Sequence, residues 1–214
     1  MGVSAYVVGV VCDLDRAVQA WMQSPALQHD ALLQGMAGLL NWWGGDGVIY
    51  CGVLLWIGAR VANRRALALV GVRGLEALAV ASAISGIIKG VAGRARPFVA
   101  PGEPWQFSVL NGWTDAHYFS LPSGHTTATT AFAIAVCMVT LGASRWSRAI
   151  SGGLLVVSAL LVACARMYTD QHWATDVLFG ALLGGTVSWW LTRWHLRHGD
   201  SAFDRALAGR SATV

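Results

Sequence analysis

The chain has 214 residues, of which 55% are hydrophobic and only 12% are charged. That charged share is about half that of an ordinary soluble domain, so the composition excludes a soluble globular protein and predicts a membrane protein. At about 20 residues per crossing, the length suits one bundle of five or six transmembrane helices and leaves little for a soluble domain. We therefore predict an all-α integral membrane bundle.

The net charge of +4 comes almost wholly from arginine, since the chain has fourteen Arg and a single Lys. A basic balance can indicate nucleic-acid binding, but these Arg residues stand at the ends of apolar runs, which favours a role in membrane topology and no nucleic-acid partner. The four Cys residues are scattered without C-x-x-C spacing. We therefore expect neither a disulfide framework nor a metal site built on them.

Residues 1–45 form the first predicted domain, an amphipathic region at the membrane surface. Residues 1–12 are apolar but too short to cross a bilayer, and they lack the basic start of a signal peptide. From Leu14 to Trp43 apolar residues recur with helical spacing on either side of Pro25. This pattern predicts two amphipathic helices at the interface. The alternative is that residues 1–12 are the end of a first transmembrane span.

Residues 46–198 form the predicted transmembrane domain, and residues 199–214 form a predicted cytoplasmic tail. The apolar runs long enough for spans lie at about residues 46–62, 74–92, 125–141, 149–165 and 173–194. A polar connection rich in Gly, Pro and Trp occupies residues 93–121 and contains no run long enough to cross.

The Arg residues at the ends of the predicted spans indicate which side of the membrane each connection faces, because cytoplasmic loops carry an excess of Lys and Arg. Three regions hold them, at residues 60–73, 145–148 and 193–210. An even number of predicted crossings separates each region from the next, so all three share one side, the cytoplasmic one. The connection at 93–121 and the polar residues considered next then face the outer side.

The segment from Cys164 to Asp176 contains Arg166, His172 and Asp176. If the chain is helical from about His172 onward, the i, i+4 spacing puts the carboxylate on the same face as the imidazole. A carboxylate that holds one ring nitrogen leaves the other free to act as nucleophile or base. Arg166 adds a planar cation suited to phosphate. The alternative is that Arg166 snorkels to the membrane surface and the other two are unrelated polar residues.

Two further polar groups are predicted to reach the same membrane surface. In the segment Pro122 to His125, Ser123 can cap a helix and Gly124 lets the backbone approach a ligand, so the helix start suits an anion. An ordinary turn before a span is the alternative.

Lys89 and Arg96 lie seven residues apart, so both present charge to one side if the helix persists. Lys89 could instead simply snorkel from a span end. Arg94 lies off that face and is expected to support the site from behind or to contact lipid headgroups.

Together these segments resemble the signature motifs of the type 2 phosphatidic acid phosphatase family, which includes bacterial acid phosphatases and vanadium haloperoxidases. The matching motifs are Lys89-x6-Arg96-Pro97, Pro122-Ser123-Gly124-His125 and Arg166-x5-His172-x3-Asp176, in the order typical of the family. The resemblance covers residues 46 to 195, and three spaced motifs are a specific signal. One departure is Ala165, where the family usually has Ser. The other is the front end, where six-span members have a complete first span.

The resemblance implies a role for each matched residue. His172 would attack phosphorus, with Asp176 holding its other nitrogen, and His125 would protonate the leaving group and then activate water. The residues implied in phosphate binding are Lys89, Arg96, Ser123, Gly124 and Arg166. Because the cations can replace a metal and no carboxylate cluster suits Mg²⁺, we expect no metal and no cofactor.

The resemblance and the predicted topology together imply a lipid phosphatase of the bacterial inner membrane, with its site facing the periplasm. The expected substrates are undecaprenyl diphosphate, phosphatidylglycerol phosphate or phosphatidate, and the first is favoured. The connection at 93–121 is either a headgroup selector or a lid. The alternatives are a lipid phosphotransferase with an isoprenyl diphosphate donor and a non-enzymatic anion transporter. The transporter is disfavoured because the span interiors carry few charges. The sequence does not indicate an oligomeric state.

Overall fold

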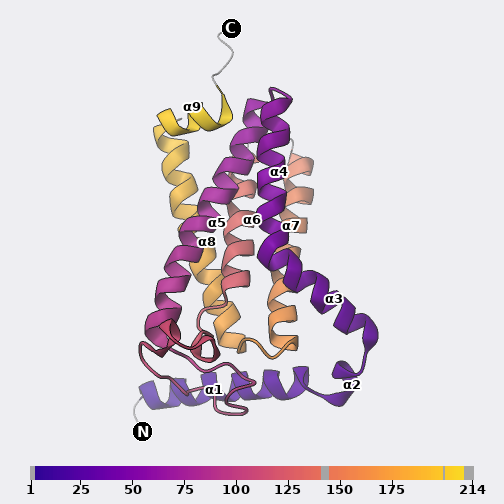
Figure 1. Cartoon of the computed structure of the whole chain (residues 1–214), viewed down its shortest axis with the longest axis vertical. Coiled ribbons are helices and arrows are strands. Elements are labelled where there is room, and N and C mark those ends of the chain that lie inside the picture. The colour runs from indigo at the N-terminus through magenta and orange to yellow at the C-terminus, as the bar shows by residue number, and fades with distance from the viewer. Residues whose placement is uncertain (1–2, 141–144, 200, 210–214) are drawn as a thin grey trace.

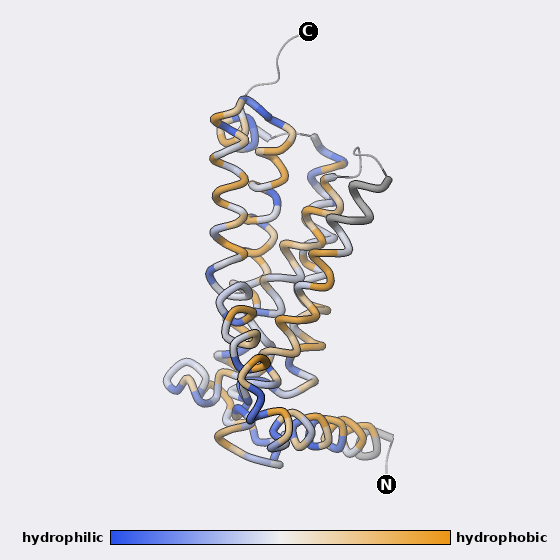
Figure 2. Tube along the Cα trace, turned by 90° about the vertical axis from the view of Figure 1, so that its right-hand side faces the viewer, coloured by the Kyte–Doolittle hydropathy of each residue, from blue (hydrophilic) through white to orange (hydrophobic). Residues whose placement is uncertain are grey.

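The computed structural model describes residues 3–140, 145–199 and 201–209, and every regular element in this part of the chain is a helix (Figure 1). The upright helices of the bundle are α4 (Val48–Val61), α5 (Arg65–Ala92), α6 (Gly124–Val139), α7 (Arg145–Tyr168) and α8 (Ala174–His198). Hydrophobic residues predominate along them (Figure 2). The all-α class predicted from the sequence is confirmed.

Helix α6 is the centre of the bundle and packs against α5, α7 and α8. Small buried residues line its contact with α5, where Ala77 and Ala81 meet Ala131 and Ala135. Small side chains at a helix interface let two backbones approach closely, which is how apolar helices associate in a membrane. Phe132 fills the wider space toward α4.

Two glycines hold the beginning of α8 directly against the beginning of α6. A Cβ atom at Gly180 would lie 2.7 Å from the carbonyl oxygen of Ser123, and one at Gly184 would lie 2.3 Å from that of Thr127. Any larger residue would push the two helices apart. The close approach also lets the backbone N–H of Ser123 donate to the carbonyl of Asp176 over 2.9 Å. The starts of these two helices are therefore fixed relative to each other.

The helices extend beyond the spans predicted from the sequence. Helix α5 begins at Arg65, not near residue 74, so Arg73 lies inside a helix and not in the loop where the sequence analysis placed it. Arg73 is buried there because Nη2 pairs with Oδ2 of Asp204 at 3.0 Å. The sequence pattern gave no sign of this distant partner. The predicted end of the third span, at residue 141, lies outside the described residues.

The N-terminal region consists of α1 (Val3–Met22), α2 (Pro25–Gln28) and α3 (Ala31–Trp42). Helix α1 lies across one end of the bundle, nearly perpendicular to the upright helices (Figures 1 and 2). Its exposed face carries Val7, Val10, Leu14 and Trp21, as expected of a helix on a membrane surface. Residues 3–12 belong to this transverse helix, which does not support the alternative of a first span ending at residue 12.

The domain boundary predicted after residue 45 is not a break in the structure. Helix α3 continues through a π-helical turn, η1 (Trp43–Gly47), directly into α4. Helix α3 also packs against α7 of the bundle. Residues 31–61 are therefore one kinked helical stretch, and α3 belongs structurally to the bundle.

The predicted C-terminal tail contains a docked helix, α9 (Ala202–Ala208). Asp204 and Ala208 are buried, and the indole N–H of Trp56 donates to the carbonyl of Leu207 over 3.0 Å. Helix α9 lies at the end of the bundle opposite α1 (Figure 1). Residues 200 and 210–214 of the predicted tail lie outside the described residues.

Among the described residues, one helix is long and apolar enough to cross a membrane by length and composition, namely α5. The apolar segments Gly124–Val139 and Gly152–Tyr168 are shorter. The count of five or six spans therefore stays a prediction.

Candidate active site

The predicted site residues all lie at the end of the bundle that α1 crosses. Lys89 is in the last turn of α5, and the connection to α6 carries Arg96 and the cap residue Ser123. Arg166 ends α7, and Asp176 begins α8. Because α5 and α7 run toward this end while α6 and α8 start from it, segments far apart in sequence meet there (Figure 1). The fold therefore brings the predicted site residues to one end of the bundle, and their roles stay predictions.

The connection between α5 and α6 folds back over the end of α5. Gly93, in the left-handed conformation at φ 57°, ends the helix. Two short helical turns, η2 (Asn111–Trp113) and η3 (Ala116–Tyr118), then shape the loop. The Trp113 indole packs so closely on Gly90 that a Cβ there would lie 2.1 Å from it. The loop therefore covers Lys89 and shields it from solvent.

His172 and Asp176 are neighbours, but not because both lie on a helix. Helix α8 begins at Ala174, so His172 lies two residues before the helix that was considered from about His172 onward. The Asp176 carboxylate instead accepts from the backbone N–H of Trp173 over 2.9 Å, which closes the first turn of α8. This turn places Oδ2 of Asp176 3.6 Å from Nδ1 of His172.

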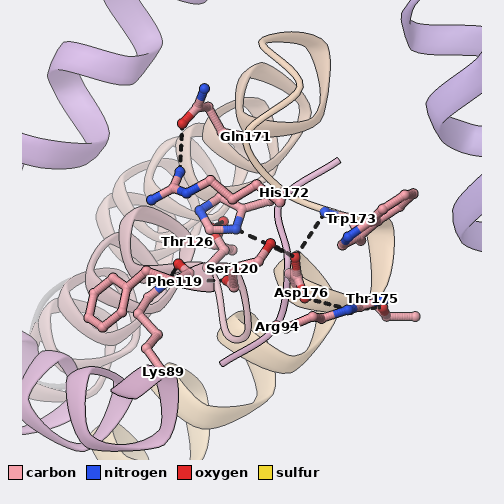
Figure 3. Close-up of polar contacts among 12 residues, drawn as sticks. Lys89, Arg94, Phe119, Ser120, Thr126, Gln171, His172, Trp173, Thr175 and Asp176 are labelled. Carbon is pink, nitrogen blue, oxygen red and sulfur yellow. Dashed lines mark hydrogen bonds and ion pairs between the residues drawn. The ribbon is translucent and has the colours of Figure 1, made fainter. Parts of the chain in front are cut away.

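Both carboxylate oxygens of Asp176 accept hydrogen bonds from side chains. Ser120 Oγ donates to Oδ2 and Arg94 Nη1 donates to Oδ1, each over 2.5 Å (Figure 3). The carboxylate is fully buried. With its rotation blocked, it can face only one way, toward the His172 ring.

The His172 imidazole is neutral in this environment. Its pKa is lowered to about 3, mainly by burial and further by the charges of Lys89 and Arg166, although Asp176 acts to raise it. Its Nδ1 has no hydrogen-bond partner among the described residues. At 3.6 Å the Asp176 carboxylate is slightly too far for a hydrogen bond, and such contacts commonly tighten when substrate binds. A neutral imidazole keeps a lone pair for attack on phosphorus.

The cations surround this pair but do not share one helical face. Helix α5 ends at Ala92, so the condition that the helix persists from Lys89 to Arg96 is not met. Lys89 Nζ donates to the carbonyls of Phe119 and Ser120 over 2.8 and 3.1 Å (Figure 3). Arg96 Nη1 donates to Gln171 Oε1 over 2.5 Å.

Arg166 uses one N–H group to contact α3 and leaves another N–H group for a ligand. Its Nη1 donates to Asn41 Oδ1 over 3.1 Å, while its Nε is buried with no partner among the described residues. A buried donor without a partner is costly unless a ligand satisfies it. Arg166 is thus equipped to bind an anion.

The start of α6 faces the same space. Ser123 is the N-cap residue but makes no side-chain cap bond, contrary to the expected capping role. Its hydroxyl contacts that of Thr126 at 3.0 Å instead. A Cβ at Gly124 would lie 3.6 Å from Cε of Lys89, with no closer neighbour. The first residue of α6 therefore lies beside the Lys89 side chain, and the first N–H groups of a helix have no partner within the helix.

His125 packs against the π-helical turn η1. A Cβ at Gly45 would lie 3.1 Å from Nε2 of His125, and one at Gly44 would lie 3.3 Å from its Cβ. The charges of Arg166, Lys89 and Arg96 all act on this imidazole. Since the charges of Lys89 and Arg166 also act on His172, both imidazoles lie within electrostatic reach of the same two cations.

A known protein family matches the part of the chain that carries the three motifs. Residues 71–200, more than half of the chain, match the model of the family described as the PAP2 superfamily. The chain belongs to the PAP2 superfamily. The family resemblance read from the three motifs is thereby confirmed.

One PAP2 relative is an Escherichia coli (strain K12) protein named "Putative undecaprenyl-diphosphatase YbjG", which is 33% identical over 132 residues. The match covers 62% of this chain but only 58% of that protein, less than two thirds of its length. The fold is similar to the crystal structure of the first transmembrane PAP2 type phosphatidylglycerolphosphate phosphatase from Bacillus subtilis. The TM-score is 0.66 and the identity 20%, over 89% of this chain and 88% of that one.

Ala165 stands where the third PAP2 motif usually has Ser, and its surroundings are apolar. Ala165 is buried in an apolar cluster with Met22, Ala37 and Tyr168, between the N-terminal helices and α7. An alanine suits this cluster, because a hydroxyl in apolar surroundings needs a hydrogen-bond partner.

Of the two roles expected for Arg94 in this PAP2 protein, the structure favours the one behind the site. Arg94 is buried against Asp176 and does not face the lipid headgroups. Sequence reasoning missed other residues around the site. Ser120, which donates to Asp176, and Asp15, which accepts from Arg94, were not predicted from the sequence. Gly44 and Gly45 carried a weak signal, since a Gly-Gly pair between two apolar helical runs indicates a place where something packs closely.

Proposed function

We propose that this protein is a membrane phosphatase that releases phosphate from a phosphorylated lipid through a phosphohistidine. The observation that carries the proposal is the placement of His172, with Asp176 behind it, within electrostatic reach of the same two cations as His125. A nucleophile with an orienting carboxylate, a second imidazole for proton transfer and three cations for phosphate make a complete set for phosphoryl transfer.

The reaction proceeds in two displacements. His172 attacks phosphorus through Nε2, the bond from phosphorus to the leaving oxygen breaks, and His125 donates a proton to that oxygen. His125 then takes a proton from water, the water oxygen attacks phosphorus, and the bond to His172 breaks to release phosphate. Asp176, facing Nδ1, offsets the positive charge that His172 carries while it is phosphorylated.

Protein cations stabilise the negative charge in both steps. Lys89, Arg96 and Arg166, with Ser123 and the backbone N–H of Gly124, hold the nonbridging oxygens. Within the described residues, no group of three or more His, Cys, Asp or Glu side chains is placed to hold a metal ion. We propose that turnover needs no metal, because the cations supply the charge that a metal supplies in other phosphatases.

The substrate is proposed to be a lipid diphosphate or monophosphate. The relatives are named for undecaprenyl diphosphate and phosphatidylglycerolphosphate, and the sequence similarity to the first favours undecaprenyl diphosphate over phosphatidylglycerol phosphate and phosphatidate. The upright helices carry exposed apolar side chains, among them Leu54, Leu160 and Leu182, which suit a substrate whose tails stay in the bilayer.

We infer the orientation in the membrane from the charges at the two ends of the bundle. Arg60, Arg64 and Arg65 lie at the turn between α4 and α5, at the same end as Arg193 and Arg197, which are in the last turns of α8. Arg145 and Arg148 have side chains outside the described part. We place this end in the cytoplasm and the site at the periplasmic face of a bacterial inner membrane, with five spans formed by residues 46–198.

The test is phosphate release from a panel of lipid phosphates in detergent with EDTA present. The intact protein is expected to turn over without metal, whereas His172→Ala should lose about a thousandfold or more in kcat, because it removes the proposed nucleophile. His29→Ala is the matched control, since His29 is exposed at the end of α2. Its activity should equal that of the intact protein.

Two results would contradict the proposal. Activity of His172→Ala equal to that of the control would remove the assigned nucleophile, and complete inhibition of the intact protein by EDTA would remove metal-free turnover. Phosphorylated lipid product without free phosphate would identify a phosphotransferase instead.

A further inference from the structure

Asp15 is a buried carboxylate on the transverse helix α1, within contact of the candidate site. Its side chain is 0% exposed, although α1 lies at the surface of the bundle. Oδ1 accepts from the backbone N–H of Thr175 over 2.9 Å, and Oδ2 accepts from its hydroxyl over 2.7 Å. Asp15 therefore binds the first turn of α8, directly beside Asp176.

Arg94 lies between two carboxylates. Nη1 donates to Oδ1 of Asp176 over 2.5 Å, and Nη2 donates to Oδ2 of Asp15 over 2.7 Å. Nε and Nη2 also donate to the carbonyl of Pro104. Arg94 is itself buried, and Figure 3 shows it pointing toward Thr175 and Asp176. One buried positive charge is thus shared by two buried negative charges.

The sharing determines how much negative charge Asp176 presents to His172. If Arg94 had Asp176 as its single acidic partner, the pair would be neutral and would stabilise a phosphorylated, positively charged imidazole poorly. With Asp15 included, the three groups carry a net charge of −1, and the second carboxylate offsets Arg94. Water screens buried charges only weakly. The additional negative charge of Asp15 therefore helps to stabilise the positive charge on the phosphorylated His172 ring.

We infer that Asp15 is a positioning residue for the reaction: it holds and neutralises Arg94, which leaves Asp176 fixed, negative and facing Nδ1 of His172. This inference rests on the proposed function of His172. It makes the membrane-surface helix α1 part of the catalytic unit, because the carboxylate comes from α1 while its partners come from the connection after α5 and from α8.

The experiment measures kcat and KM separately for Asp15→Asn in the full-length protein. Asparagine keeps the size of the side chain and an oxygen for the Thr175 N–H, but it removes the charge. Residues that orient a reacting group from behind typically cost about 10- to 100-fold in activity when replaced. We expect kcat to fall in that range while KM stays within about twofold, since Asp15 touches no substrate.

The matched control is Asp13→Asn on the same helix. Asp13 is exposed and pairs with Arg16 over 3.0 Å, so this change removes the same charge from α1 without touching Arg94. Its kcat is expected to equal that of the intact protein. An equal loss in both variants would show a general effect of charge on α1 and would overturn the inference.

A second, less disruptive variant separates an effect on catalysis from a loss of folding. Thr175→Val keeps the shape and the backbone N–H but removes the hydroxyl that contacts both Asp15 and Arg94, and it should lower kcat by about three- to tenfold at unchanged KM. Single-turnover formation of the phosphoenzyme should slow by the same factor as kcat in each variant. A merely structural role would instead lower the melting temperature and the amount of active protein without slowing that step.

The outcomes separate the inference from the proposed function. If His172→Ala is inactive while folded Asp15→Asn and Thr175→Val keep the kcat of the intact protein, the role of Asp15 falls and the nucleophile stands. If His172→Ala stays active, the proposed function falls first. A raised KM at unchanged kcat in Asp15→Asn would also overturn the inference, because it would assign Asp15 to substrate binding.

Discussion

At the scale of single residues, the site combines groups that are costly to bury with contacts that make the burial tolerable. Asp176 remains ionised in the interior because a guanidinium and a hydroxyl hold it. His172 is buried without a hydrogen bond at Nδ1 and stays neutral. Carrying an imidazole in this state has a consequence for the stability of the whole protein.

We predict that His172 makes the fold sensitive to acid. Its pKa is about 3 in the folded protein and about 6.5 when unfolded. Between these values the unfolded chain binds a proton that the folded protein does not, so the stability falls as the pH drops below about 6.5. From pH 7.5 to 5, the protein should lose about 2 kcal/mol more than His172→Asn. Denaturation in detergent at both pH values measures this difference.

Parallel pH dependences of the protein and the His172→Asn variant would contradict this prediction. They would show that the imidazole is as easily protonated in the folded state as in the unfolded chain.

At the scale of secondary-structure elements, the π-helical turn η1 contacts His125 and joins α3, which contacts Arg166, to α4. Isolated π turns inside longer helices are uncommon and often mark functional sites. Gly44 and Gly45 in this turn leave room for the His125 ring. The kink and its glycines therefore determine where the proposed proton donor sits.

We predict that side chains at Gly45 displace the His125 imidazole. A Cβ there would lie 3.1 Å from Nε2, so Gly45→Ala should lower kcat by about three- to tenfold and Gly45→Val by more, because small misplacements of a catalytic group are costly. Gly58→Ala in α4 is the control, since nothing lies within 4 Å of its Cβ position. Turnover and melting temperature are measured for all three.

Alanine in a helix is intrinsically favoured over glycine, so Gly45→Ala should lose activity without losing stability. Full activity in Gly45→Val would show that His125 needs no fixed position.

At the scale of the whole molecule, the two ends of the bundle have different contents. One end holds the candidate site beneath the transverse helix α1, and the other holds the turn between α4 and α5 together with α9 (Figure 1). Helix α9 is anchored by the buried pair of Arg73 and Asp204 and by a hydrogen bond from Arg65 to the carbonyl of Gly209. The proposed orientation places these ends on opposite sides of the membrane.

We predict opposite labelling of single cysteines at the two ends, in a background with the four native cysteines replaced by alanine. Val109, in the connection before α6, is 72% exposed, so Val109→Cys should react in intact spheroplasts with a thiol reagent that cannot cross membranes. Arg64→Cys, exposed at the turn between α4 and α5, should react only after lysis. The reverse pattern would invert the orientation.

The sequence by itself predicted the helical class, the family and the residues that meet at one end of the bundle. Motifs at the ends of successive apolar runs return to one surface because helices of similar length alternate in direction. The lengths and order of the apolar runs indicate this arrangement, so Lys89, His125 and His172 could be assigned to a common site from the sequence alone.

Only the tertiary structure decided how the site is held. The Arg94 contacts to Asp15 and Asp176 join residues 79 and 82 positions apart, and single charged residues leave no periodic pattern in a sequence. The same holds for Asp204, whose partner Arg73 lies in α5. Burying a lone charge is unfavourable, so these residues become compatible with the interior only through partners that folding brings to them.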